Sequence, residues 1–235
     1  MRIGNSELTR NIDNYCINEL KIPSIVLMEN AAIKVVKNID FEKFKSFTIV
    51  CGTGNNGGDG LAVARQLFSM NMQIDVFIVG NNSMSKDCNV NYDILKNMGI
   101  NINHIIKSED IKALNEALCK NDMTIDAIFG IGLTRRVEGI CEEVINIINK
   151  KSKSTLAIDI PSGMKCDSFG ILGTSIEANK TISFEVYKKG FLDYEGEKYI
   201  GTIIVEKIGV PEYVVNKFHH KEYLTEIGDV KNIIK

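Results

Sequence analysis

The segment that most limits how this chain can fold is residues 50–68, VCGTGNNGGDGLAVARQLF, where five glycines stand between an apolar run and a helical pattern. Glycine in a regular element costs about 1 kcal/mol of backbone entropy. So many together predict a backbone that bends sharply and closely approaches another group. Gly52, Gly54 and Gly57 fit G-x-G-x-x-G, whose backbone N–H groups and helix start favour phosphate oxygens. A tight turn without a ligand is the alternative.

Apolar runs and helical patterns alternate along the rest of the chain. Residues 5–19 and 24–39 predict two helices, with Asn5 or Ser6 and then Ser24 as their N-caps. Strands are predicted at 46–51, 73–80, 102–106, 124–130, 154–163, 178–184 and 201–209, and helices at 58–70, 86–98, 109–119 and 139–150. This alternation predicts an α/β fold, three-layer αβα and Rossmann-like, with a doubly wound, mostly parallel sheet and an N-terminal helical segment. Ligands of such folds bind beyond the carboxyl ends of the strands.

Composition limits the classes of function. The chain has 235 residues, 44% of them hydrophobic, and a formal net charge of −2. These values predict an ordinary globular core and disfavour a polybasic surface for nucleic acid. Six cysteines lack CxxC spacing, which favours free thiols in the cytoplasm over zinc sites. No apolar run reaches the length of a membrane span or a signal peptide, so we expect a cytoplasmic protein without a membrane partner.

Three details separate the glycine-rich segment from other nucleotide-binding loops. The strand at 73–80 is followed by Asn81 and Asn82, without the acidic residue of dinucleotide dehydrogenases. Asp59 lies inside the loop, where it would repel a diphosphate unless a cation or hydroxyl intervened. No Gly-Lys-Ser/Thr follows the glycines, which excludes a Walker loop and disfavours a phosphotransferase.

Several long motifs occur in the order of one known family. GTGNNGGDGLAVAR resembles the signature of the YjeF N-terminal domain family, the NAD(P)H-hydrate epimerases. ELTRNIDNYCINELKIPSIVLMENAA, DAIFGIGLTRRVEG, AIDIPSGM and TISFEVYKKGF resemble its other motifs, so the match spans about residues 8–210. The resemblance implies an isomerase that interconverts the R and S forms of hydrated NADH and NADPH in coenzyme repair. Related non-catalytic domains leave open a Rossmann-like scaffold or nucleotide-binding module.

The reaction implied by the resemblance begins with loss of hydroxide from C6 of the nicotinamide ring, which leaves an iminium-like cation. Water added to the other face gives the other epimer. Such a site needs groups that bind the phosphates, a carboxylate near the cation and a proton donor or acceptor. Asp159 is the predicted catalytic residue, because Pro161 and Gly163 favour a turn that directs it into the crevice. Whether it stabilises the cation, carries the proton, binds the ribose or only caps the turn stays open.

The matching positions also define a predicted substrate-binding set. Its members are Asn55, Asn56, Gly57, Gly58, Asp59, Gly130, Ile131, Gly132, Leu133, Thr134, Arg135, Arg136, Asp159 and Lys188. Which of the two arginines contacts phosphate is open, and the lysine lies either at the site or in a surface turn. Glu29 and Asn30 lie near the crevice or pack between helices.

Polar oxygens from three predicted strand ends converge on a possible cation site. Asn56, Asp126 and Ser162 offer hard oxygen ligands. The resemblance implies that these three residues hold a potassium ion, whose charge would offset those of the phosphates and acids nearby. A purely structural acid at a strand end is the alternative for Asp126.

The resemblance also implies a domain organisation. Residues 1–210 form the predicted YjeF N-terminal domain, and residues 211–235 form a C-terminal tail. EYLTEIGDVKNIIK, at residues 222–235, resembles the lead-in to a dehydratase domain that is fused behind this domain in many bacterial proteins. A free-standing epimerase is the alternative. The expected partners are the hydrated coenzyme and a second copy of the chain, in a homodimer formed through the N-terminal helices.

Overall fold

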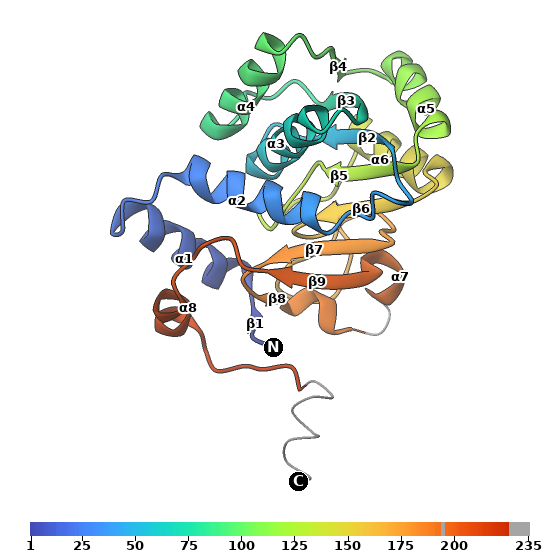
Figure 1. Ribbon diagram of the computed structural model, residues 1–235. Coiled ribbons are helices and arrows are strands. Elements are labelled where there is room, and N and C mark those ends of the chain that lie inside the picture. The colour runs from blue at the N-terminus through green and yellow to red at the C-terminus, as the bar shows by residue number, and fades with distance from the viewer. Residues whose placement is uncertain (194–195, 226–235) are drawn as a thin grey trace.

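The computed structural model describes residues 1–193 and 196–225. Its centre is a seven-stranded sheet with the order β4-β3-β2-β5-β6-β7-β9 (Figure 1). The strands are β2 (Ser46–Cys51), β3 (Gln73–Val79), β4 (Ile102–Ile105), β5 (Met123–Ala127), β6 (Thr155–Ile158), β7 (Lys180–Phe184) and β9 (Thr202–Glu206). Every neighbouring pair in this sheet is parallel. The predicted parallel α/β fold is confirmed, and the strand order reverses between β2 and β5.

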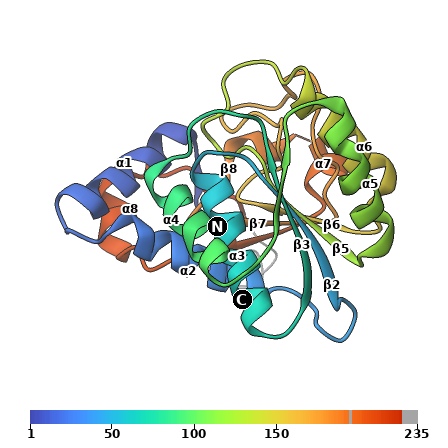
Figure 2. The ribbon, with the colours of Figure 1, turned by 90° about the horizontal axis from the view of Figure 1, so that it is seen from above.

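Helices cover both faces of the sheet. On one face lie α2 (Ser24–Lys37), α3 (Asn55–Ser69) and α4 (Lys86–Asn97), and on the other lie α5 (Ile111–Lys120) and α6 (Ile140–Lys151) (Figure 2). Alternation along β2 supplies both cores, because successive side chains of a strand point to opposite faces. Phe47 and Ile49 pack on the α3 side, whereas Val50 packs on the α5 and α6 side. This is the predicted doubly wound, three-layer arrangement.

The N-terminal segment packs against part of the C-terminal one. Helix α1 (Ser6–Asn18) begins at the expected cap Asn5 and contacts α8 (Glu212–Phe218), whose Val214 and Val215 are buried in the core. A second sheet pairs β1 (Ile3–Gly4) with β8 (Tyr187–Lys188) in parallel. The sequence patterns missed α8, β1 and β8 because each is short. Residues 226–235, which hold most of the dehydratase-like lead-in, lie outside the described residues.

Shorter elements complete the described fold. These are the 3₁₀ helices η1 (Ser108–Asp110) and η2 (Lys189–Leu192) and the helix α7 (Glu197–Ile200). Helix α2 begins at residue 24, as predicted, but its N-cap is Pro23 and not Ser24. The Pro23 carbonyl accepts a hydrogen bond from Val26 N–H at 2.9 Å. Within residues 1–193 and 196–225, no helix has both the length and the apolar character needed to cross a bilayer.

The glycine-rich segment forms the first turn of α3 rather than a loop before it. The helix starts at Asn55 instead of residue 58, and Gly58 N–H already donates to Gly54 O at 3.1 Å. The glycines are needed for close approach. A Cβ on Gly57 would lie 1.9 Å from the carbonyl oxygen of Gly52, and one on Gly58 would lie 2.7 Å from Cε of Met28. The end of β2 and the start of α3 are therefore pressed together.

This close approach leads to a stability prediction. Gly57→Ala is expected to lower the free energy of unfolding by about 3 kcal/mol, at the upper end of overpacking costs, because the clash involves backbone. Gly54→Ala is the matched control, since a Cβ there has no heavy atom within 4 Å, and its effect should stay within about 0.5 kcal/mol. Urea denaturation measures both. Equal losses in the two variants would contradict the close-packing explanation.

Candidate active site at the carboxyl edge of the sheet

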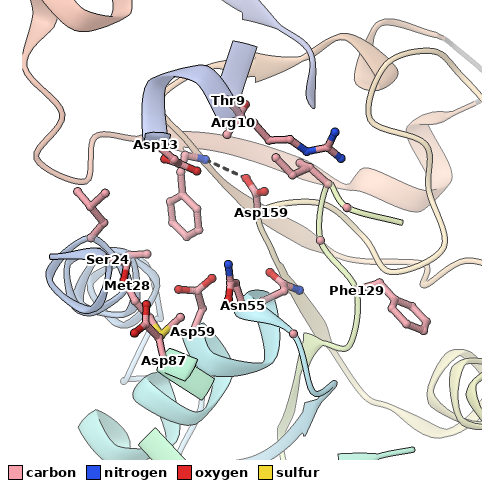
Figure 3. Close-up of a pocket in the computed structure, with 18 of the residues that line it drawn as sticks. Thr9, Arg10, Asp13, Ser24, Met28, Asn55, Asp59, Asp87, Phe129 and Asp159 are labelled. Atoms are coloured by element: carbon pink, nitrogen blue, oxygen red, sulfur yellow. Dashed lines mark hydrogen bonds between the residues drawn. The ribbon is translucent and has the colours of Figure 1, made fainter. Parts of the chain in front are cut away.

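A cavity of about 880 Å³ opens beyond the carboxyl ends of β2, β5, β6 and β7 (Figure 3). Helices α1, α2, α3 and α4 contribute to its walls, together with the loop that follows β5. It includes the point where the strand order reverses, which is the usual ligand position in open parallel sheets. The glycine-rich start of α3 and the turns after β5 and β6, which the sequence singled out, meet at this cavity.

Most predicted site residues reach the cavity wall. The lining includes Asn55, Asn56, Asp59, Gly130, Ile131, Gly132, Leu133, Thr134, Arg135 and Asp159. Gly57 and Gly58 lie behind it, packed against the loop after β2 and against α2. Arg136 is exposed and pairs with Glu138 at 3.7 Å, so Arg135 is the arginine of this pair that faces the cavity. Lys188 is fully buried beside the cavity and is not part of its lining.

Asp159 has an unusual backbone conformation. Its φ is +63°, and the flanking Ile160 N–H donates to Ile158 O at 2.8 Å, which closes a γ-turn at the end of β6. This γ-turn is the rare and strained form. The ladder bond from Asp159 N–H to Ile182 O, at 2.8 Å, keeps the residue attached to β7. Strain of this kind persists where the surroundings fix it, and it gathers at functional sites.

A buried lysine holds the Asp159 carboxylate. Lys188 Nζ lies 2.9 Å from Asp159 Oδ1, and the two side chains are 0% and 12% exposed. The same ammonium donates to Phe184 O at 3.1 Å. Burial lowers the pKa of Lys188, but the charge of Asp159 and its hydrogen bond help to outweigh this, so the pKa stays above its ordinary value. Lys188 therefore remains charged and fixes the carboxylate at the cavity edge.

Other carboxyl groups surround Asp159. Asp13 on α1, Asp59 on α3 and Asp87 on α4 also line the cavity (Figure 3). Burial raises the pKa of Asp13 to about 6, and burial followed by the charge of Asp159 raises the pKa of Asp59 well above its usual range. A wall with so many acids suits a positively charged ligand group and would repel a phosphate.

Glu185 forms a second γ-turn, at the end of β7. Its φ is +60°, and Val186 N–H donates to Phe184 O at 2.7 Å. Glu185 Oε1 accepts from Ile208 N–H at 2.7 Å, while Oε2 is buried without a partner among the described residues. Neighbouring strands thus end in the same strained turn, each with an acid that lines the cavity.

The sequence patterns did not single out Asp13, Arg10 or Glu185. The helical pattern of α1 could have identified Asp13 and Arg10. Leu8 and Ile12 form the buried stripe of α1, and a polar stripe that includes Arg10 and Asp13 lies directly beside it. An acid that flanks an apolar stripe commonly lies at the boundary between core and solvent. Glu185 carried no signal, because its position depends on a turn that no local pattern specifies.

The predicted cation ligands occupy the ends of β5 and β6 and the start of α3. Ser162 Oγ donates to Asp126 Oδ1 at 2.6 Å and Ser162 N–H donates to Oδ2 at 2.8 Å. Burial raises the pKa of Asp126 to about 6, against the lowering effect of these hydrogen bonds. The amide nitrogen of Asn56 is buried without a partner in the described part of the chain. The Cβ, Cγ and Oδ1 atoms of the same side chain lie beside Gly130.

Glu29 and Asn30 connect α2 to its neighbours. Asn30 Nδ2 donates to Ile208 O at 2.7 Å, in the loop after β9. The Glu29 carboxylate binds Arg65 and Gln66 of α3. Neither residue lines the cavity. Their contacts fix the helix that forms one of its walls.

Comparisons with known proteins agree with this arrangement. Residues 24–190 match the family described as "YjeF-related protein N-terminus". The chain is 40% identical over 216 residues to NAD(P)H-hydrate epimerase of Anaerococcus prevotii, covering 92% of this chain and 98% of that protein. It is 35% identical over 219 residues to a bifunctional NAD(P)H-hydrate repair enzyme of Moorella thermoacetica, and the match covers 91% of this chain and 41% of that protein.

A crystal structure of a yeast protein superposes with a TM-score of 0.76 and 22% sequence identity, over 97% of this chain and 98% of the yeast chain. At that identity the likeness supports the fold alone. The family match and the near full-length relatives settle the classification. The chain belongs to the family of YjeF-related protein N-terminal domains.

Proposed function

We propose that this protein interconverts the R and S forms of hydrated NADH and NADPH, and so acts as an NAD(P)H-hydrate epimerase in coenzyme repair. The family and the names of its full-length relatives support this activity. The structural observation that supports it most is Asp159, held in a strained turn by the buried Lys188 at the edge of a large cavity. A scaffold domain has no need of such a carboxylate.

The charges of the cavity suggest how the substrate binds. The acids around Asp159 suit the pyridine ring, which becomes cationic during the reaction. Arg135, the loop at 130–134 and the start of α3 suit the diphosphate, because they offer a guanidinium and backbone N–H groups. We therefore place the ring between α1 and the end of β6, and the diphosphate along the loop after β5.

In this arrangement Asp159 stabilises charge that develops on the ring. Loss of the C6 hydroxyl leaves a cation, and an ionised carboxylate fixed beforehand favours that state without reorganisation. Lys188 acts as a positioning residue, since it contacts Asp159 and lies outside the cavity lining. Water that adds to the opposite face of the ring then completes the interconversion.

The activity is tested with one purified epimer of hydrated NADH. We expect the protein to convert it to the equilibrium mixture of R and S forms, followed by chromatography, much faster than a blank without protein. Folded protein that binds NADPH and leaves the epimer at the blank rate would instead support the non-catalytic binding module.

Potassium is the proposed cofactor. Asp126, Ser162 and Asn56 fit a monovalent cation, because they combine a single carboxylate with a hydroxyl and an amide. The unpartnered amide of Asn56 supports this fit: with its oxygen and nitrogen exchanged, it would present an oxygen instead. When bound, the ion would offset the charge of Asp126 and of the substrate diphosphate.

A potassium site leads to a stability prediction. The midpoint of thermal unfolding should be higher in potassium chloride than in choline chloride at equal ionic strength, because a ligand that binds only the folded state stabilises it. Ser162→Ala should lose most of this difference, whereas Ser69→Ala, at the exposed end of α3, should keep it. Equal midpoints of the wild type in both salts would contradict the site.

We also propose a cytoplasmic homodimer formed through the N-terminal helices. Val26 and Ile33 support this interface, because they lie two turns apart on α2 and are 44% and 46% exposed. The relative in Moorella thermoacetica is named as bifunctional, which supports a fused dehydratase as a further partner domain in some proteins of this kind.

A further inference from the structure

We propose that Asp13, on helix α1, is the proton-carrying group of this site, and that Asp159, the partner of Lys188, stabilises the cationic ring. The inference rests on the proposed epimerase function and divides its chemistry between two carboxyl groups. Both residues line the same cavity, from elements far apart in the sequence (Figure 3).

The hydrogen bonds of the two groups separate their roles. Asp159 accepts from Lys188 Nζ at 2.9 Å, and from Ser183 Oγ and Phe184 N–H at 3.4 Å each. These three donors occupy one carboxylate oxygen and fix its position. Among residues 1–193 and 196–225, no hydrogen bond reaches the carboxyl group of Asp13. Asp13 can therefore take up a proton and offer it to a group in the cavity.

The contacts of α1 fix the direction of Asp13. Asn5 caps the helix, and Ser6 donates from its N–H and Oγ to the two oxygens of Asp167 at 2.6 and 2.7 Å. Ile12 is 1% exposed and anchors the helix in the core. With the helix held at its start and along its apolar stripe, the adjacent Asp13 faces the cavity.

The proposed step conserves atoms and charge. The Asp13 carboxylic acid donates its proton to the hydroxyl on C6, the C6–O bond breaks, and its electron pair leaves with water. The lone pair of ring nitrogen N1 forms the C6–N1 double bond of the cation. Water then attacks the opposite face of C6, the electron pair of the double bond returns to N1, and the released proton returns to Asp13 through cavity solvent. Asp159 takes no part in the proton transfer.

Charged groups from several other elements influence the pKa of Asp13. Burial raises its pKa to about 6, Lys188 of β8 lowers the pKa, and Asp159 and Glu185 beyond β6 and β7 raise it. Asp59 of α3 is also coupled to it electrostatically. A carboxyl group with such a pKa exchanges protons readily near neutral pH. Because the hydrate must meet protonated Asp13, kcat/KM should fall as pH rises through the pKa.

The experiment measures kcat/KM for epimer exchange between pH 5 and 8. The kcat/KM of the wild type should fall about tenfold per pH unit above about pH 6, as expected for a required acid with that pKa. The kcat/KM of Asp13→Asn should be about 100-fold below that of the wild type at pH 6, and it should not fall further as the pH rises. Asp13→Glu should recover part of the rate together with the fall, and Glu7→Gln, exposed on the same helix, should match the wild type.

The outcomes distinguish a failure of the role of Asp13 from a failure of the proposed epimerase function. If the wild type exchanges epimers with a flat profile, or if Asp13→Asn keeps both the rate and the pH dependence, Asp13 is not the proton carrier and the epimerase function stands. If the folded wild type does not exchange epimers at all, the proposed function fails. NADPH binding by Asp13→Asn, measured by fluorescence, should be retained, which a collapsed cavity would not allow.

Discussion

Replacing Asp159 with asparagine is expected to slow epimer exchange by about 10²–10³-fold, the usual effect of removing one preorganised electrostatic contact from a transition state. Asparagine has nearly the same shape, and it tolerates the positive φ of +63° at this position better than most residues. The loss should therefore appear in kcat, measured by chromatography of the two epimers, while NADPH binding is kept.

The control for this substitution is Asp93→Asn. Asp93 is an exposed acid on α4 that accepts a hydrogen bond from Asn89 at 3.0 Å and is not part of the cavity lining. It should leave the exchange rate unchanged. If Asp159→Asn exchanged epimers at the rate of the wild type, Asp159 would have no part in stabilising the cation.

The second large effect concerns the stability of the Asp159–Lys188 pair. Removing one partner of a buried ion pair costs about 3–5 kcal/mol, because the other charge remains buried without compensation. The two single variants should differ. Asp159→Asn leaves a lysine that is 0% exposed, whereas Lys188→Met leaves a carboxylate that is 12% exposed beside the cavity. We therefore expect the larger loss for Asp159→Asn.

The double variant Asp159→Asn/Lys188→Met separates stability from catalysis. It removes both charges, so its free energy of unfolding in urea should lie well above the value expected from adding the two single losses. Its exchange rate should stay low. Additive losses would contradict a direct coupling of the pair, and recovery of activity would contradict the catalytic role of Asp159.

Local patterns in the sequence were sufficient to predict the strands of the sheet. Apolar runs such as SFTIVC and QIDVFIV predicted β2 and β3, because buried parallel strands are short, apolar and bounded by turns. The residues that follow β2, β5 and β6 could then be assigned to one edge of the sheet. The glycines predicted a close approach, which is confirmed, and a loop, which is wrong. Helical glycines allow such an approach equally well, and α3 begins inside the motif.

Contacts between distant segments could not be read from local patterns. Lys188 reaches Asp159 because β8 pairs with β1 and because β6 ends in a γ-turn, and neither feature has a local signature. Asp13 reaches the cavity because α1 lies across the carboxyl edge of the sheet. Its helical pattern predicts which residues face inward, but it does not predict which part of the domain they face.

A crystal structure of the protein with bound NADPH tests the central claim most directly. The pyridine ring should lie beside Asp159, between α1 and the end of β6, and the diphosphate should follow the loop at 130–135. A nucleotide bound with its ring on that loop and its phosphates among the acids, or bound outside the cavity, would contradict the account.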